Sequence, residues 1–260
     1  MKRTLVTLDL SAFPERFRPL MEGTDIYDSS CSPEARVWFL DREGGLFLKS
    51  APKGTLENEA KMTAYFHSKG LSAEVLDYVT ADRDWLLTSR VSGEDCTWRP
   101  YLDDPTRLCD TIAERLRMLH ELSFEGCPID HVARYTETAR QNYRNGNYDT
   151  SLFPDNWGYA SVAEAWAEVE TNGKHLKREV LLHGDYCLPN IMLDNWRFSG
   201  FIDVGNGGVG DRHVDIFWGA WTLNFNLKTD AYRNRFYDAY GRDRICEDTL
   251  RTIAAFEVFG

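Results

Sequence analysis

Apolar residues recur with two different periods along the chain, and the change of period divides it into two parts. About ninety residues at the start favour short strands and one helix, whereas the pattern after Gly93 is mostly helical. In the strand predicted at Gly45–Lys49, alternation puts Phe47 and Lys49 on one face and two leucines on the other. Lys49 is therefore expected to share its surroundings with an aromatic ring.

One amphipathic helix is predicted in the first part, at Leu56–Lys69, with Thr55 as its N-cap. Glu59 has apolar neighbours at helical spacing, so its carboxylate faces inward. Because an unpaired buried charge is strongly destabilising, we predict an ion pair with Lys49. The alternative is a carboxylate at the rim of the helix and a solvated lysine. Glu57, the competing acid, lies on a more polar face.

A β-hairpin is predicted further along the chain. Two apolar runs, Ile191–Leu193 and Phe198–Ile202, flank the turn sequence Asp194–Asn195. Such a hairpin brings Asn190, which precedes the first run, close to Asp203, which follows the second.

Helical patterns account for most of the chain after Gly93. Asp104 is a predicted N-cap and Pro105 the first residue of the next helix. Its apolar stripe ends just before His120, which we interpret as a packed or exposed helix residue without a catalytic role. Further helices are predicted at Val162–Glu170, Arg212–Phe225, Lys228–Tyr240 and Glu247–Phe259.

Three polar residues have the order and spacing that phosphoryl transfer requires. Asn190 follows Asp185 by five residues, and Asp203 follows Asn190 by thirteen. An aspartate can orient a hydroxyl, while an amide and a second carboxylate can hold Mg2+ between phosphates. Each residue alone also fits an ordinary turn. The ordered set favours a kinase.

The segments around these residues resemble the aminoglycoside 3'-phosphotransferases. The resemblance is strongest at His183–Ile191 and Gly200–Gly205, extends from Ser30 to Phe259, and is weak between Glu125 and Lys177. It implies an α+β, bilobal protein-kinase-like fold, with a small β-rich N-lobe and a larger, mostly α-helical C-lobe. The expected boundaries are 1–92 for a nucleotide-binding lobe with the hinge, and 93–260 for a catalytic and substrate-binding lobe.

The same resemblance implies roles for individual residues. Asp185 is the catalytic base, Asn190 and Asp203 bind Mg2+, and His183 and Asp215 support the catalytic loop.

Other residues are expected to bind the nucleotide. Lys49, paired with Glu59, contacts the phosphates. The expected contacts elsewhere on the nucleotide come from Ser32 in a nucleotide-positioning loop, from Phe47 stacking on adenine, and from the backbone of Ser89 and Val91 in the hinge.

Acceptor binding is expected from Asp149 and Asp155 in a loop and from Glu257 near the C-terminus. The chain departs from the family here. Val258 stands where the family has a second terminal acid, and a further acid is missing near Asn224.

Composition narrows the possible partners. The 260 residues carry a formal net charge of -11, which argues against nucleic acid and anionic membranes and suits a cationic small molecule. Six cysteines without metal-ligand spacing are expected to be reduced thiols. Neither a long apolar run nor a signal-peptide pattern occurs, so we expect a cytoplasmic protein, as a monomer or a homodimer.

The resulting hypothesis is a kinase that transfers the γ-phosphoryl group of ATP, or GTP, to the 3'-hydroxyl of an aminoglycoside and so confers antibiotic resistance. A kinase of the same fold that acts on another amino sugar, sugar or choline-like alcohol is the first alternative. The second is a nucleotide-binding module without catalysis, which has no need of the base Asp185.

Overall fold

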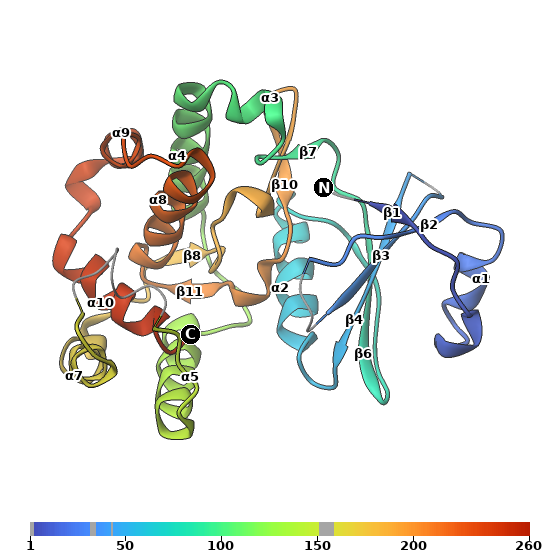
Figure 1. Cartoon of the computed structure of the whole chain (residues 1–260), viewed down its shortest axis with the longest axis horizontal. Helices are drawn as coiled ribbons and strands as arrows, with labels where there is room; N and C mark the ends of the chain where they lie inside the picture. Colours follow the sequence, from blue (N-terminus) through green and yellow to red (C-terminus); the bar gives the residue numbers. More distant parts are fainter. Residues whose placement is uncertain (1–2, 32–34, 43, 151–158) are drawn as a thin grey trace. The chain divides into compact units, whose positions relative to one another are not determined.

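The computed structural model describes residues 3–31, 35–42, 44–150 and 159–260. Its contacts form two compact units (Figure 1). The first combines Met1–Trp98 with Pro189–Gly205, and the second combines Arg99–Leu188 with Asn206–Gly260. The segment Pro189–Gly205 thus packs with the first unit, although it follows residue 93 in sequence. The boundary expected after residue 92 remains a prediction about the lobes.

A six-stranded antiparallel sheet forms the centre of the first unit, in the order β1-β2-β3-β4-β6-β5. The strands span Thr4–Leu5 (β1), Ile26–Asp28 (β2), Arg36–Leu40 (β3), Leu46–Pro52 (β4), Val75–Thr80 (β5) and Arg83–Ser89 (β6). The sequence analysis predicted β4 and its alternation: Leu46 and Leu48 are buried, and Phe47 and Lys49 lie on the opposite face.

The two faces of this sheet are covered differently. Against one face pack the aromatic residues Phe13 and Phe17 from the segment before helix α1 (Arg18–Met21), together with Trp38 and Trp85 of the sheet. The two tryptophan rings stack with centroids 6.0 Å apart. Helix α2 (Glu57–Ser68) lies against the opposite face, which carries Lys49 (Figure 1). A smaller apolar cluster connects the helix and the sheet.

Helix α2 is close to its predicted span, but its predicted N-cap is wrong. The Thr55 hydroxyl donates to the Pro52 carbonyl at 2.7 Å, and the cap position falls on Leu56. The amide of Leu56 donates instead to the buried carboxylate of Asp84 on β6, at 3.0 Å. A side chain from a distant strand therefore satisfies the first turn, which a local pattern cannot reveal.

The predicted hairpin is present, but its two-residue turn is Asn195–Trp196, one residue later than the predicted Asp194–Asn195. Strands β9 (Ile191–Asp194) and β10 (Arg197–Phe201) pair antiparallel, and β9 also pairs with β7 (Glu94–Asp95). Asn195 and Trp196 have φ values of 50° and 67°, so the two-residue turn has the positive φ angles of a type I' hairpin. Pairing with β7 explains why this late segment belongs to the first unit.

The second unit is mainly helical. Its helices are α3 (Arg99–Leu102), α4 (Pro105–His120), α5 (His131–Asn145), α7 (Val162–Asn172), α8 (His213–Leu227), α9 (Arg233–Tyr240) and α10 (Glu247–Glu257). Strands β8 (Val180–Leu182) and β11 (Gly208–Gly210) form a small antiparallel pair. Short 3-10 turns lie at Leu10–Ala12, Gly173–His175, Leu188–Asn190, Val204–Asn206 and Arg242–Arg244.

Most of the predicted helices are present, with two differences. Helix α4 begins as expected, because the Asp104 carboxylate accepts from the Arg107 amide. Helix α9 begins at Arg233, not at Lys228, because Lys228 has a left-handed φ of 56° and ends helix α8. Helix α5 was not predicted.

In the part of the chain that the structure describes, no helix has the length and apolar character needed to cross a membrane.

Candidate active site

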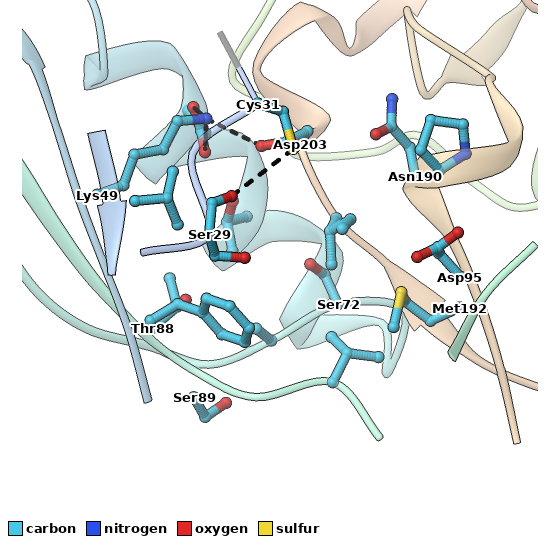
Figure 2. A pocket seen from close by; sticks show the side chains of 18 of the residues that line it. Ser29, Cys31, Lys49, Ser72, Thr88, Ser89, Asp95, Asn190, Met192 and Asp203 are labelled. Carbon is cyan, nitrogen blue, oxygen red and sulfur yellow. Dashed lines mark hydrogen bonds and ion pairs between the residues drawn. The ribbon is translucent and has the colours of Figure 1, made fainter. Parts of the chain in front are cut away.

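A cavity of about 450 Å³ lies within the first unit (Figure 2). Its walls come from β4, α2, β6 and the hairpin segment. Residues predicted to bind nucleotide or metal line it together: Phe47, Lys49, Glu59, Ser89, Val91, Asn190 and Asp203. Ser32 lies outside the described residues, but Ser29 and Cys31 from the same segment line the cavity.

Lys49 forms the centre of a three-residue ion cluster. Its Nζ lies 2.9 and 2.8 Å from the two carboxylate oxygens of Glu59, and 2.9 Å from Oδ1 of Asp203. Burial by itself would lower the pKa of Lys49, but the charges of Asp203 and Glu59 outweigh it and raise the pKa. Lys49 is therefore a fixed cation on the cavity wall.

Glu59 is the more deeply enclosed of the two carboxylates. Its side chain is 14% exposed, against 52% for Asp203. Burial raises the pKa of Glu59, and the ammonium of Lys49 opposes that shift. The competing acid Glu57 pairs instead with Lys61 at 2.6 Å on the exposed side of α2. The structure thus contains the Lys49–Glu59 pair that the sequence pattern predicted.

The chain after β10 approaches α2 closely through a glycine. A Cβ on Gly205 would lie 3.1 Å from Cβ of Glu59. Asp203, two residues earlier, has a φ of 54°, a conformation that non-glycine residues rarely adopt. Such strained backbone is concentrated at functional sites. It occurs here at the carboxylate that reaches Lys49.

Asn190 and Asp203, the two predicted metal-binding residues, both line the cavity with oxygen-bearing side chains. The Ile202 amide donates to the Asn190 carbonyl at 3.0 Å, which ties the two segments together. Among the described residues, no group of three or more His, Cys, Asp and Glu side chains is arranged to hold a metal ion. An amide with one half-exposed carboxylate nevertheless fits Mg2+, which keeps several waters and is completed by phosphate oxygens.

The other end of the cavity carries the residues expected to bind the base. The Ser89 amide donates to the Glu74 carbonyl at 3.0 Å, so it is already engaged. An adenine contact from the Ser89 backbone, as expected for the hinge, would therefore use its carbonyl and not its amide. Arg3 also lines this cavity. The sequence analysis missed it because no local pattern connects the N-terminal strand with the hinge.

The predicted catalytic loop lies in the second unit and is held by a buried acid. Asp215 is completely buried, and its two carboxylate oxygens accept from the amides of His183 and Gly184, each at 2.8 Å. His120 Nε2 lies 3.1 Å from the same carboxylate. Burial would raise the pKa of Asp215, but the hydrogen bonds from His120 and from the Gly184 amide favour its ionised form, and its pKa is lowered. His120 is thus packed, as expected, and supports Asp215.

Further contacts fix the backbone around Asp185. The Asp185 amide donates to Nδ1 of His183 at 3.3 Å, and the Leu188 amide donates to the Thr222 hydroxyl at 3.1 Å. Gly184 has a φ of 84°, and a Cβ there would overlap the Asn206 carbonyl. Glycine is therefore required immediately before Asp185.

A second carboxylate lies in the electrostatic neighbourhood of Asp185. Oε1 of Glu257 accepts from the Tyr135 hydroxyl at 2.6 Å and from Nε1 of Trp218 at 3.2 Å. Burial, together with the charge of Asp185, raises the pKa of Glu257 to about 7. The sequence analysis missed Tyr135 because it lies on the unpredicted helix α5, and Trp218 because its helical pattern indicates only packing.

The remaining acceptor residues have mixed outcomes. Asp149 is exposed, and its amide donates to the carbonyl of Val258 at 2.9 Å, which brings its backbone next to the segment that follows Glu257. Asp155 lies outside the described residues. Val258 is buried, at 3% exposure, so the position where a second acid was expected packs into the interior.

Comparisons with known proteins agree with this arrangement. The sequence profile of the phosphotransferase enzyme family, APH, matches residues 32–256. The probable aminoglycoside 3'-phosphotransferase of Lactococcus lactis subsp. lactis (strain IL1403) is 49% identical over 257 residues, with 97% of each chain covered.

Solved structures of similar proteins share the fold. Aminoglycoside-3'-phosphotransferase of type VIII superposes with a TM-score of 0.78 at 25% identity, covering 94% of this chain and 97% of that one. APH(3'')-Id from Streptomyces rimosus ATCC10970, in complex with ADP and streptomycin, superposes with a TM-score of 0.73 at 24% identity, covering 96% and 99%. The predicted α+β, kinase-like fold and the predicted phosphotransferase class are confirmed. By sequence and by fold, this chain belongs to the phosphotransferase enzyme family and is related over nearly its whole length to the probable aminoglycoside 3'-phosphotransferase of Lactococcus lactis.

Proposed function

We propose that this protein transfers the γ-phosphoryl group of ATP to the 3'-hydroxyl of an aminoglycoside. The observation that carries the proposal is the cation of Lys49, held by Glu59 and Asp203 in the wall of a cavity. A lysine paired with a helix glutamate is the arrangement with which kinases grip nucleotide phosphates. The acceptor class is supported by the name of the 49% identical relative from Lactococcus lactis.

Nucleotide phosphates would bind at Lys49, which already faces the cavity. Asn190 and Asp203 would hold Mg2+ there, and the bound ion would neutralise part of the phosphate charge. Lys49 now contacts both Glu59 and Asp203, so phosphate oxygens would take over its contact with Asp203. Glu59 would keep Lys49 in position because its carboxylate is the less exposed partner.

Asp185 would act as the general base for the acceptor. Its carboxylate would accept a hydrogen bond from the acceptor hydroxyl and take the proton as the new O–P bond forms and ADP leaves. The loop around Asp185 is supported by the Asp215 contacts to the His183 and Gly184 amides. A fixed loop limits the misplacement that reduces catalysis.

Glu257 and Asp149 would bind ammonium groups of the acceptor. A half-buried carboxylate that already accepts two hydrogen bonds is held in one orientation, so a charged amine would meet a fixed partner. The net charge of -11 favours a cationic acceptor over an anionic one. Because Val258 replaces an acid of the family, Glu257 would carry more of the recognition.

The decisive experiment combines one variant with one pair of substrates. Asp185→Asn should lower kcat by roughly 10²–10⁴-fold while nucleotide binding is retained. Asp194→Asn, at the exposed end of β9, is the matched control and should keep the wild-type kcat. An aminoglycoside with a 3'-hydroxyl should be phosphorylated, and its 3'-deoxy analogue should not.

Each other result has a defined meaning. Full activity of Asp185→Asn refutes the catalytic base. Turnover of the 3'-deoxy analogue at the same rate refutes the position of transfer. Nucleotide binding with no turnover of aminoglycosides, sugars or amino alcohols supports a binding module, whereas turnover of simple sugars or amino alcohols alone supports the related kinase.

A further inference from the structure

Arg3 reaches the nucleotide cavity from the far end of the sequence. It directly precedes β1, and its guanidinium carbon lies 3.8 Å from the ring centroid of Phe39 and 5.6 Å from that of Phe47. The two rings are cross-strand partners on β3 and β4, with centroids 5.2 Å apart. The planar cation and the two rings therefore form a continuous patch at the cavity, which Arg3 and Phe47 both line.

Part of this cation is buried without a partner. Nε of Arg3 is inaccessible to solvent and makes no hydrogen bond within the described chain. The charges that act on the side chain come from Arg90, Glu94 and Asp41, so both signs surround it. Leaving a buried donor unsatisfied is unfavourable, and such groups call for an explanation. The remaining guanidinium atoms are the ones that a ligand in the cavity would contact, since Arg3 lines it.

The strand register shows which part of a nucleotide Arg3 can meet. Phe39 pairs with Phe47, whereas Val37 pairs with Lys49. At about 3.3 Å per residue, the Arg3 end of the cavity is roughly 7 Å along the strands from the phosphate-binding Lys49. The hinge residues Ser89 and Val91 also line the cavity, and Phe47 is the ring expected to stack on adenine. Arg3 therefore lies at the end of the cavity where the nucleobase is expected to bind.

We propose that Arg3 is a binding residue for the nucleobase of the phosphoryl donor. Its guanidinium, held over Phe39, would extend the stacking surface of Phe47 over the purine by cation-π contact. The contribution would go to nucleotide affinity and leave the chemical step unchanged. This inference rests on the proposed kinase function, because it assumes that the cavity binds the donor nucleotide.

The test separates the base from the phosphates. The Mg2+ complexes of ADP and of inorganic tripolyphosphate, which has no base, are measured as inhibitors competing with ATP. Arg3→Ala should raise the inhibition constant of ADP about tenfold, the order expected for one cation-π contact. The same variant should change the inhibition constant of tripolyphosphate less than twofold. Arg3→Lys, which keeps the charge but loses the plane, should fall between Arg3→Ala and the wild type for ADP. The kcat of both variants should match that of the wild type.

Arg16→Ala is the matched control, since it removes an arginine from the same unit. Arg16 is 53% exposed and pairs with Asp77 at 2.7 Å. The proposal is overturned if Arg3→Ala and Arg3→Lys bind ADP as Arg16→Ala does. Equal losses of affinity for ADP and for tripolyphosphate also overturn the proposal, because they would mean that Arg3 contacts the phosphates. Absence of nucleotide binding in the wild type would instead refute the function on which the inference rests.

Discussion

Glu257 should make the stability of this protein depend on pH in a direction opposite to that of most carboxylates. Burial and the nearby charge of Asp185 raise its pKa from 4.5 to about 7, although Tyr135 and Trp218 donate hydrogen bonds to it. Between these two values the folded protein binds more protons at this site than the unfolded chain does. Stability therefore falls as pH rises from 4.5 to about 7, and the loss is complete above that range.

The magnitude follows from the size of the shift. The difference between 4.5 and about 7 is about 2.5 pKa units, and each unit is worth about 1.4 kcal/mol. Glu257→Gln removes the titration and keeps a side chain of similar shape that can accept the same hydrogen bonds. Relative to the wild type, its free energy of unfolding should therefore rise by about 3 kcal/mol between acidic and mildly alkaline solution.

The assay is urea unfolding of both proteins in steps of about one pH unit across this range. Glu247→Gln, at the exposed start of the same helix α10, is the control for the removal of one charge. Curves of stability against pH that stay parallel for wild type and Glu257→Gln would refute the reasoning. So would a Glu257→Gln protein that gains stability relative to wild type as the pH falls.

The Michaelis constant of a cationic acceptor should fall as pH rises through about 7, because Glu257 then becomes charged.

Two further substitutions test the catalytic loop and the ion cluster. Gly184→Ala should lower kcat at least tenfold and lower the melting temperature, because its Cβ would overlap the Asn206 carbonyl. Gly146→Ala is the control: Gly146 has a similar φ of 72° but open space around it, so this variant shows the cost of the φ angle alone. Lys49→Met should abolish transfer and destabilise the protein by about 3–5 kcal/mol by leaving Glu59 buried and unpaired. The double variant Lys49→Met with Glu59→Gln should recover stability in urea but no activity; recovery of neither would contradict the ion-pair account.

Local patterns predicted the elements that carry the ion cluster, because each depends on neighbouring residues. Alternation placed Lys49 on the correct face of β4, and helical spacing turned Glu59 inward on α2. The hairpin followed from its flanking apolar runs, although its turn was predicted one residue too early, at Asp194–Asn195. The ion pair itself was predicted from a general rule, that buried charges are paired.

Two gaps in the prediction involve contacts between distant parts of the chain. Thr55 is a suitable N-cap by residue type, yet Asp84 of another strand satisfies the first turn of α2. Helix α5 has a weakly apolar sequence, and Tyr135 on it is recognised as part of the site only through its hydrogen bond to Glu257, 122 positions away.

Residue type and spacing alone determined the class of chemistry, since Asp185, Asn190 and Asp203 have one order that suits phosphoryl transfer. Tertiary structure decided how these groups are charged and held. The pKa of Glu257 and the second partner of Lys49, at Asp203 154 positions away, depend on burial and on contacts made only when the chain is folded. The same holds for Arg3 at the base end of the cavity, because strand pairing brings it to Phe39 and Phe47.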